Sequence, residues 1–117
     1  MAKGELDVST TIEIAGRPIG VDHPPLVIAE IGINHGGDLG VAIEMVDAAA
    51  DAGVEVVKHQ THVVDDEMSG AARRVIPGNT KESIYDVMAS CALDEDEEAQ
   101  MKDHVESRGM VFLSTPF

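Results

Sequence analysis

Apolar residues in this chain gather in short runs that alternate with longer amphipathic segments. LVIAEI at 26–31 is a continuous apolar run with one acid, and apolar residues also open the segments 54–60 and 110–114. Such runs are typical of strands in a parallel sheet, where other layers cover both faces. Ahead of them, residues 10–21 hold two apolar pieces around Ala15-Gly16-Arg17-Pro18, which predicts a β-hairpin.

Three further segments have the composition and the end signals of helices. Asp38 is a candidate N-cap ahead of a stripe of small and apolar residues, and Gly53 lies where that helix is expected to stop. Asn79 or Thr80 is a candidate cap for a second helix. The acids at 94–97 resemble a capping box that opens a third. We therefore predict helices over 39–52, from about 80 to Cys91 and from about Asp94 to Ser107, with an irregular segment at 61–79.

The order of these elements predicts the fold class. Strands that alternate with helices imply a parallel α/β sheet with right-handed crossovers. A complete (β/α)8 barrel needs about 250 residues, and three strands alone would leave two bare sheet edges. We therefore expect the N-terminal portion of a TIM (β/α)8 barrel, with about three strands in residues 26–117, preceded by a β-hairpin and lead-in at residues 1–25.

Polar side chains lie at the end of every predicted strand. Glu30 ends the first strand, Lys58 and Gln60 end the second, and Ser114 and Thr115 end the third. Active sites of α/β folds lie at the carboxyl ends of the strands, where Lys58 can meet an anionic substrate. Side chains alternate along a strand. One face, pointing into the barrel, is therefore expected to carry Leu26, Ile28, Glu30, Val54, Val56, Lys58, Gln60, Val111, Leu113 and Thr115.

Each of these residues also has a purely structural interpretation. Glu30 and Lys58 could form an ion pair that closes the top of the barrel, although a buried pair is costly to desolvate, which favours function. Gln60 could satisfy backbone groups. The segment 34–37 could be an ordinary turn, or a backbone cradle for an anion. The five histidines show no zinc pattern, so we expect no metal site within this chain.

The charge of the chain restricts its partners. Its 22 acids and 8 bases give a formal charge of −14, which argues against nucleic acid and acidic lipid surfaces. No apolar run is long enough to span a bilayer, and the first ten residues are too polar for a signal peptide. A single cysteine, Cys91, excludes an internal disulfide. These features predict a cytoplasmic protein with no membrane partner, and a salt-adapted source would also explain the acidity.

Several motifs together resemble the start of bacterial N-acetylneuraminate (sialic acid) synthases. They are PLVIAEIGINHGGDL, EVVKHQTHVVDDEMS, VIPGN, SIYDVM, CALDEDE and VESRGMVFLSTPF. The resemblance runs from about Ile12 to Phe117, and the motif residues show no departure from the family pattern. KHQTH, where KFQT is common elsewhere in that family, favours the N-acetylneuraminate branch together with DEMS and VIPGN. Legionaminate-type synthases are the near alternative.

The resemblance implies an activity and a larger protein. Members of that family condense phosphoenolpyruvate with N-acetylmannosamine and water, which gives N-acetylneuraminate and phosphate. They carry an antifreeze-like domain after the barrel and form a domain-swapped homodimer. A divalent metal, Mn2+ or Mg2+, polarises the aldehyde of the sugar, and its two histidine ligands would lie beyond residue 117. Residues 1–117 alone are therefore expected to lack metal, to be inactive and to be poorly stable.

The resemblance also implies roles for residues of this chain. Lys58 would pair with phosphoenolpyruvate, Thr115 would hydrogen-bond the same substrate, and Gln60 would help to orient its carboxylate. Glu30 would lie by the reacting carbons, where it stabilises positive charge or handles protons. The remaining implied roles are contact with the sugar for Asn79 and support of Glu30 by Asn34 and His35.

Two other classes of function compete with this enzyme. A truncated, non-catalytic paralogue would keep the phosphoenolpyruvate half-site and bind anions without turnover. A purely structural α/β domain would keep any function of the intact protein after Glu30→Gln and Lys58→Met.

Overall fold

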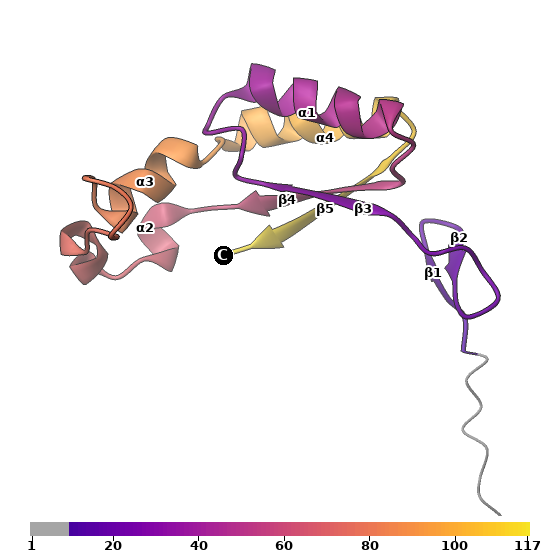
Figure 1. Cartoon of the computed structure of the whole chain (residues 1–117). Helices are drawn as coiled ribbons and strands as arrows, with labels where there is room; N and C mark the ends of the chain where they lie inside the picture. Colours follow the sequence, from indigo (N-terminus) through magenta and orange to yellow (C-terminus); the bar gives the residue numbers. More distant parts are fainter. Residues whose placement is uncertain (1–9) are drawn as a thin grey trace, which may run out of the picture.

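A computed structural model of the 117-residue chain describes residues 10–117 (Figure 1). An antiparallel hairpin is formed by β1 (Ile12–Ile14) and β2 (Arg17–Ile19). A separate parallel sheet, in the order β3-β4-β5, is formed by β3 (Ile28–Gly32), β4 (Val56–Thr61) and β5 (Val111–Pro116). The helices are α1 (Leu39–Asp51), α2 (Val64–Glu67), the 3-10 helix η1 (Gly70–Arg74), α3 (Ile84–Cys91) and α4 (Glu95–Ser107).

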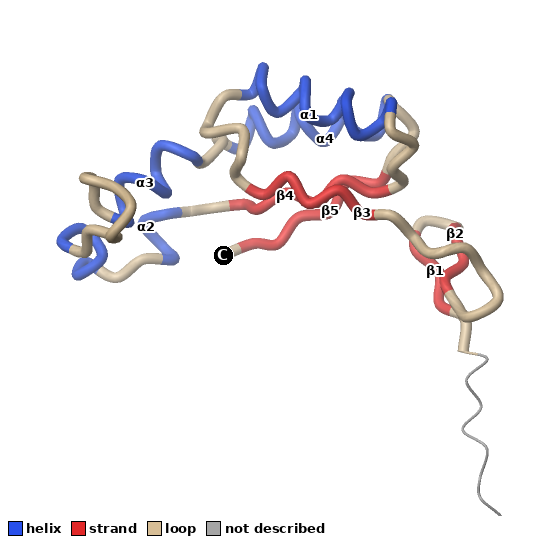
Figure 2. The backbone as a smooth tube through the Cα atoms, in the orientation of Figure 1, coloured by secondary structure: helices blue, strands red, loops and turns tan. Residues whose placement is uncertain are grey.

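The predicted hairpin and parallel sheet are both confirmed. Helices α1 and α4 lie side by side on one face of the sheet, and the opposite face carries no helix of the described chain (Figure 2). The segment with α2, η1 and α3 lies at the carboxyl ends of the strands, and the hairpin lies at their other ends (Figure 1). The sheet therefore has one covered face and one open face.

The core fills the space between the sheet and the two long helices. Each helix turns one stripe of apolar residues toward the sheet, as its 3.6-residue period requires. Full burial of a large apolar side chain contributes about 1.5–3 kcal/mol. The buried cluster consists of Ile31, Ala42, Val46, Ala49, Val57, Leu93, Met101, Val105 and Met110.

The ends of the two long helices follow the sequence signals. The Asp38 side chain accepts a hydrogen bond from the backbone N–H of Val41, 3.0 Å away, as predicted. The capping box of α4 is confirmed, because the Asp94 side chain accepts from the Glu97 N–H at 2.8 Å and the Glu97 side chain accepts from the Asp94 N–H at 3.0 Å. Among residues 10–117, no helix has the length and apolarity needed to cross a membrane.

The start of α3 differs from the prediction. Neither Asn79 nor Thr80 caps this helix, because the Thr80 hydroxyl accepts a hydrogen bond from the Glu82 N–H at 2.8 Å and forms a local turn. Ser83 is the cap, and its hydroxyl accepts from the Asp86 N–H at 3.1 Å. A competing side-chain turn therefore moves the helix start to Ile84.

The segment predicted as irregular contains the short helices α2 and η1. Contacts with α3 hold it in place. The guanidinium of Arg73 lies 3.6 Å from the centroid of the Tyr85 ring and donates to Asp65 at 3.1 Å. Such contacts between distant residues are not visible in the local pattern of residues 61–79.

Candidate active site

All the predicted site residues that belong to strands lie on the open face of the sheet, at the carboxyl ends of its strands, whereas Asn79 lies in the loop before α3. The register places Glu30 beside Lys58 and Gln60 beside Thr115. Leu113, the partner of Lys58 on β5, is 42% exposed. The alternation therefore puts these groups opposite the helices, as predicted.

Glu30 and Lys58 form a direct ion pair. The Lys58 Nζ donates to Glu30 Oε2 at 2.6 Å, and the two side chains are 32% and 46% exposed for Lys58 and Glu30 respectively. Within residues 10–117 the pair is partly exposed, so the desolvation argument for a functional pair is not tested. An ion pair with this exposure contributes little to stability.

Gly32 brings Glu30 and Gln60 close to one point. The strand register shifts between Glu30 and Gly32, and Gly32 has a φ of +53°. A Cβ atom at this position would lie 3.6 Å from the Gln60 side chain and 3.7 Å from Glu30 Oε1. The left-handed backbone favours glycine here, while the distances to the two polar groups are ordinary van der Waals contacts. The end of β3 thus sets the spacing between the carboxylate and the amide.

A cavity of about 590 Å³ lies at the carboxyl end of β4. Its lining combines polar groups with apolar ones and consists of Ile33, Gln60, His62, Glu67, Met68, Met88 and Phe117. Asn79 is exposed in the loop before α3 and is not part of this lining. Gln60 is therefore the one predicted site residue of the described chain that borders both the open face and this cavity.

A second cavity, of about 290 Å³, lies at the amino ends of the strands. It contains Arg17 and Arg108, but both cations are paired with acids. Arg17 donates to Glu55 at 2.8 Å, which lowers the pKa of that carboxyl, and Arg108 donates to Asp51 at 2.9 Å. Active sites of α/β folds lie at the carboxyl ends of the strands, so we place the candidate site there.

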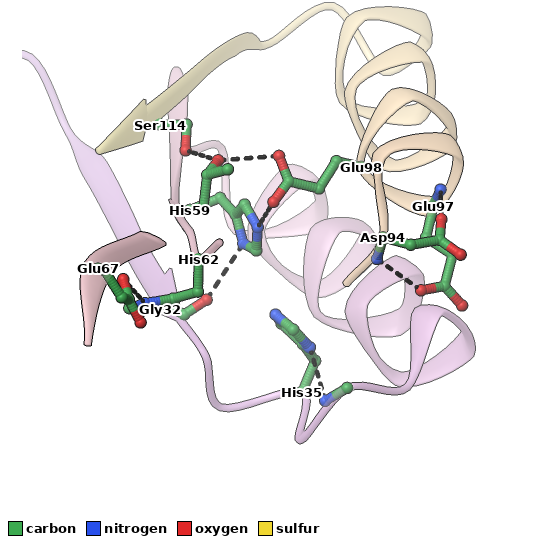
Figure 3. Close-up of polar contacts among 11 residues, drawn as sticks. Gly32, His35, His59, His62, Glu67, Asp94, Glu97, Glu98 and Ser114 are labelled. Carbon is green, nitrogen blue, oxygen red and sulfur yellow. Dashed lines mark hydrogen bonds and ion pairs between the residues drawn. The ribbon is translucent and has the colours of Figure 1, made fainter. Parts of the chain in front are cut away.

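A partly buried polar cluster around His59 lies on the covered face of the sheet (Figure 3). His59 is fully buried; its Nδ1 lies 3.2 Å from the Gly32 carbonyl oxygen and its Nε2 lies 3.1 Å from Glu98 Oε1. The Thr61 hydroxyl donates to Glu98 Oε2 at 2.8 Å and lies 2.6 Å from the Ser114 hydroxyl. The cluster links the ends of all three strands to α4.

Asn34 and His35 hold the loop after β3. The Gly37 N–H donates to His35 Nδ1 at 3.1 Å, while the buried His35 Nε2 has no hydrogen-bond partner among the described residues. Burial lowers the pKa of His35, and the neighbouring His59 ring, 5.3 Å away between centroids, lowers it further. The Asn34 side chain donates to the backbone carbonyl three residues earlier, at 2.8 Å. Neither residue hydrogen-bonds Glu30, which was the support expected of them.

A second histidine pair was not anticipated from the sequence. His62 Nδ1 lies 2.9 Å from Glu67 Oε2, and its ring stacks on Phe117 with centroids 4.7 Å apart. Its buried Nε2 has no partner within the described chain. The partners of His59 were not anticipated either, although its position on β4 gave a signal. Residues 57, 59 and 61 face the helices, and a buried imidazole there requires hydrogen-bond partners.

The fold and this geometry define a class of protein. A parallel α/β sheet with a cation, a carboxylate and an amide on one face, at the carboxyl ends of its strands, is the arrangement of an α/β enzyme active site. Residues 45–117 match the NeuB family, and the chain belongs to that family. The family resemblance inferred from the motifs is thereby confirmed.

Solved structures and curated relatives agree with this assignment. The N-acetylneuraminic acid (sialic acid) synthetase of Leptospira borgpetersenii, crystallised with citrate, is 28% identical, with a TM-score of 0.76 over 93% of this chain and 35% of that chain. The spore coat polysaccharide biosynthesis protein SpsE of Bacillus subtilis is 30% identical, with a TM-score of 0.63 over 90% of this chain and 27% of that chain. The N,N'-diacetyllegionaminic acid synthase of Legionella pneumophila is 32% identical in an alignment of 105 residues that covers 86% of this chain and 30% of that protein.

These matches confirm the expected fold, an α/β structure that corresponds to the N-terminal part of such synthases. The chain spans only 28–30% of the length of curated relatives that it matches. The activity of a whole synthase is therefore a matter for proposal.

Proposed function

We propose that this chain supplies the phosphoenolpyruvate-binding part of an N-acetylneuraminate synthase, which condenses phosphoenolpyruvate with N-acetylmannosamine and water to give N-acetylneuraminate and phosphate. The observation that carries the proposal is the ammonium group of Lys58. It lies on the open face at the strand ends, beside Glu30 and one residue from Gln60 along that face. In a chain of formal charge −14, a cation held there favours an anionic ligand.

The residues of this chain have distinct parts in the proposed reaction. The carboxylate or phosphate of the substrate replaces Glu30 as the partner of Lys58, while Gln60 and Thr115 donate hydrogen bonds that orient it. Glu30, displaced from its ion pair, is then a carboxylate beside the reacting carbons. There it stabilises developing positive charge or accepts a proton. Asn79 reaches the sugar only if the loop before α3 moves toward the cavity.

The residues described here do not form a metal site. Within residues 10–117, no group of three or more His, Cys, Asp or Glu side chains could hold a metal ion, so none of these steps is assigned to one. The Mn2+ or Mg2+ of the proposed enzyme would be bound by residues outside this chain. We also propose that the complete protein acts as a homodimer, which sedimentation of that protein would test.

A second candidate differs only in the acceptor sugar. The similarity to legionaminic acid synthases, 32% identical in Legionella pneumophila and 34% identical over 97 residues in Campylobacter jejuni, supports a legionaminate-type synthase equally well. The residues of the open face recognise the anion that both reactions share. They therefore do not distinguish the two acceptors.

The test begins with the source gene, read beyond the codon for Phe117. Further strand–helix units would allow a complete synthase to be produced, and phosphate release from phosphoenolpyruvate would then be measured with N-acetylmannosamine and with other N-acylated hexosamines. Release that depends on N-acetylmannosamine supports the first candidate, and release with another hexosamine supports the second. A stop codon after Phe117, or no release with any acceptor, contradicts the enzyme and leaves anion binding without turnover.

A further inference from the structure

The partly buried cluster on the covered face has no part in the proposed chemistry, yet it contains an ionisable pair. We name it the His59 cluster and define it as His59, Thr61, Glu98 and Ser114 (Figure 3). The His59 ring is enclosed by β3, β5, α4 and the loop after β3, and none of its surface is exposed. A buried ionisable ring must have its polar atoms paired, so the position of its protons decides how these elements hold together.

The two contacts of the ring require more protons than a neutral imidazole carries. Nδ1 lies 3.2 Å from the Gly32 carbonyl oxygen, which can only accept, and Nε2 lies 3.1 Å from Glu98 Oε1. A neutral imidazole has one N–H. If Glu98 were ionised, one of the two contacts would set a lone pair against an oxygen. Both contacts are hydrogen bonds only when the pair holds one further proton, either on His59 or on Glu98.

The surroundings of the ring leave Glu98 as the group that shares this proton. From the loop after β3 the ring faces His35, whose Nδ1 accepts a backbone hydrogen bond and whose pKa is lowered by burial and by His59. Asp38, at the N-cap of α1, acts on His35. From β5 the nearest ring is the uncharged Phe112, 6.2 Å away between centroids. The lowered pKa of His35 makes it a poor site for the extra proton, which leaves Glu98 as the ionisable partner of His59.

The carbonyl oxygen that His59 contacts belongs to Gly32, which sets the distance between Glu30 and Gln60. Gly32 ends β3 just after the register shift, between the Glu30 carboxylate and the Gln60 amide. We propose that the His59–Glu98 pair carries one proton more than a neutral imidazole with an ionised carboxylate. We further propose that this proton makes His59 a positioning residue that fixes the end of β3. Loss of the proton at higher pH breaks one contact and lets Glu30 and Gln60 separate. This inference rests on the proposed function only where activity is measured.

The proton can be located by NMR of the complete protein labelled with 15N-histidine. Near neutral pH we expect the ring nitrogens of His59, assigned by loss of their signals in His59→Gln, to report either two N–H groups or one proton shared with Glu98. As the pH rises, the side-chain amide signals of Gln60 should shift together with those nitrogens. His104, which pairs with Asp47 on the outer side of the helices, is the internal control and should not change the Gln60 signals when it is replaced by Gln.

The isosteric variant Glu98→Gln tests the positioning role. Its amide can donate to a neutral His59, so every contact is kept without the extra proton. We expect the Gln60 signals of Glu98→Gln to stay constant over the pH range in which those of the wild type shift. In the wild type, kcat/KM for phosphoenolpyruvate should fall about tenfold per pH unit above the release of a single proton. In Glu98→Gln that fall should be absent.

Two outcomes would overturn the inference. One is a single neutral tautomer of His59 beside an ionised Glu98 at neutral pH. The other is a set of Gln60 shifts that is identical in the wild type and in Glu98→Gln. A protein that shows the His59 and Gln60 changes but releases no phosphate contradicts the proposed function and leaves the positioning of Gln60 supported.

Discussion

At the scale of single residues, β4 divides its chemistry between two environments. Lys58 and Gln60 point to the open face, whereas His59 and Thr61 point to the covered face, because side chains alternate along a strand. The groups on the open face are partly exposed, and the Lys58 ammonium group is paired with Glu30. Those on the covered face are satisfied by Glu98 of α4. One strand therefore both carries the site and anchors it to a helix.

Replacement of Lys58 by Met should separate substrate binding from structure. The variant keeps the length of the side chain and removes the charge that the anion needs. In the complete protein we expect phosphate release to fall by roughly 100-fold or more, as when one charge-stabilising group is removed from an active site. The free energy of unfolding should change by only about 0–1 kcal/mol, because the pair is partly exposed.

Lys102→Met is the matched control for this experiment. Lys102 is an exposed residue of α4 whose only ion pair within the described chain is with Glu106, 3.9 Å away. Its replacement should leave phosphate release unchanged. Equal activity of Lys58→Met and Lys102→Met would favour the structural interpretation of the Glu30–Lys58 pair.

At the scale of elements, the loops at the strand ends are held by close backbone contacts. Gly37 has a φ of +77°, and a Cβ atom there would overlap the carbonyl oxygen of Ser90 near the end of α3. Gly36, with a φ of +63°, has open space around it. The loop after β3 and the end of α3 therefore approach each other at a point that admits only glycine.

Gly37→Ala should destabilise the protein more than Gly36→Ala. Both variants force alanine into a left-handed backbone, which costs roughly 1–2 kcal/mol. Only Gly37→Ala also pushes α3 away from the loop. Its free energy of unfolding should therefore be at least about 1 kcal/mol below that of Gly36→Ala. Urea denaturation of the two variants measures the difference directly. Equal destabilisation would show that the loop and α3 are not packed as described.

The two long helices are joined by an ion-pair network whose strength depends on pH. The hydrogen bond from His104, 2.8 Å away, and the charge of Arg108 lower the pKa of Asp47. A carboxyl whose pKa is lowered by folding stabilises the folded state at pH values above its pKa in the unfolded state, which is about 3.9. That contribution is lost as the pH falls through the folded value. Asp47→Asn should therefore be less stable than the wild type at pH 6, and the difference should shrink below about pH 4.

Asp103→Asn provides the comparison for that measurement. Asp103 is exposed on α4, the helix that carries His104, and its replacement should leave the pH dependence of thermal unfolding unchanged. A wild-type advantage over Asp47→Asn that stays constant down to pH 2 would contradict the role given to Asp47.

Local signals in the sequence were sufficient for the elements and insufficient for the contacts between them. The cap at Asp38 and the box at Asp94 act within four residues, so the sequence predicts them correctly. The prediction for the cap of α3 was wrong because the Thr80 hydroxyl accepts a hydrogen bond from the Glu82 N–H and forms a local turn instead. The contact between His59 and Glu98 was not predicted because the two residues are 39 positions apart in the sequence, and no local pattern indicates the contact. The placement of Lys58 and Gln60 was predictable because the period of a strand decides it.

At the scale of the whole molecule, the open face of the sheet dominates. Ile28 and Leu113, large apolar side chains of β3 and β5, are 45% and 42% exposed. The radius of gyration is 18.6 Å, whereas a compact domain of 100 residues has about 13 Å. An apolar face of this kind favours association with another surface. The elongated shape and the open face agree with a chain that matches less than a third of the length of its curated relatives.

Leu113→Ser should have opposite consequences in the 117-residue chain and in the complete protein. In the short chain the side chain is already exposed, so the variant should change the free energy of unfolding by less than about 0.5 kcal/mol and should reduce binding of a hydrophobic dye. If the rest of a barrel covers this face, Leu113 is buried in the complete protein, and the same change should cost about 2–5 kcal/mol. Met101→Ala, at a residue that is buried already in residues 10–117, is the control and should cost about 2–5 kcal/mol in both. A similar small effect of Leu113→Ser in both proteins would show that this face stays open, and the active site would then have to be complete without a closed barrel.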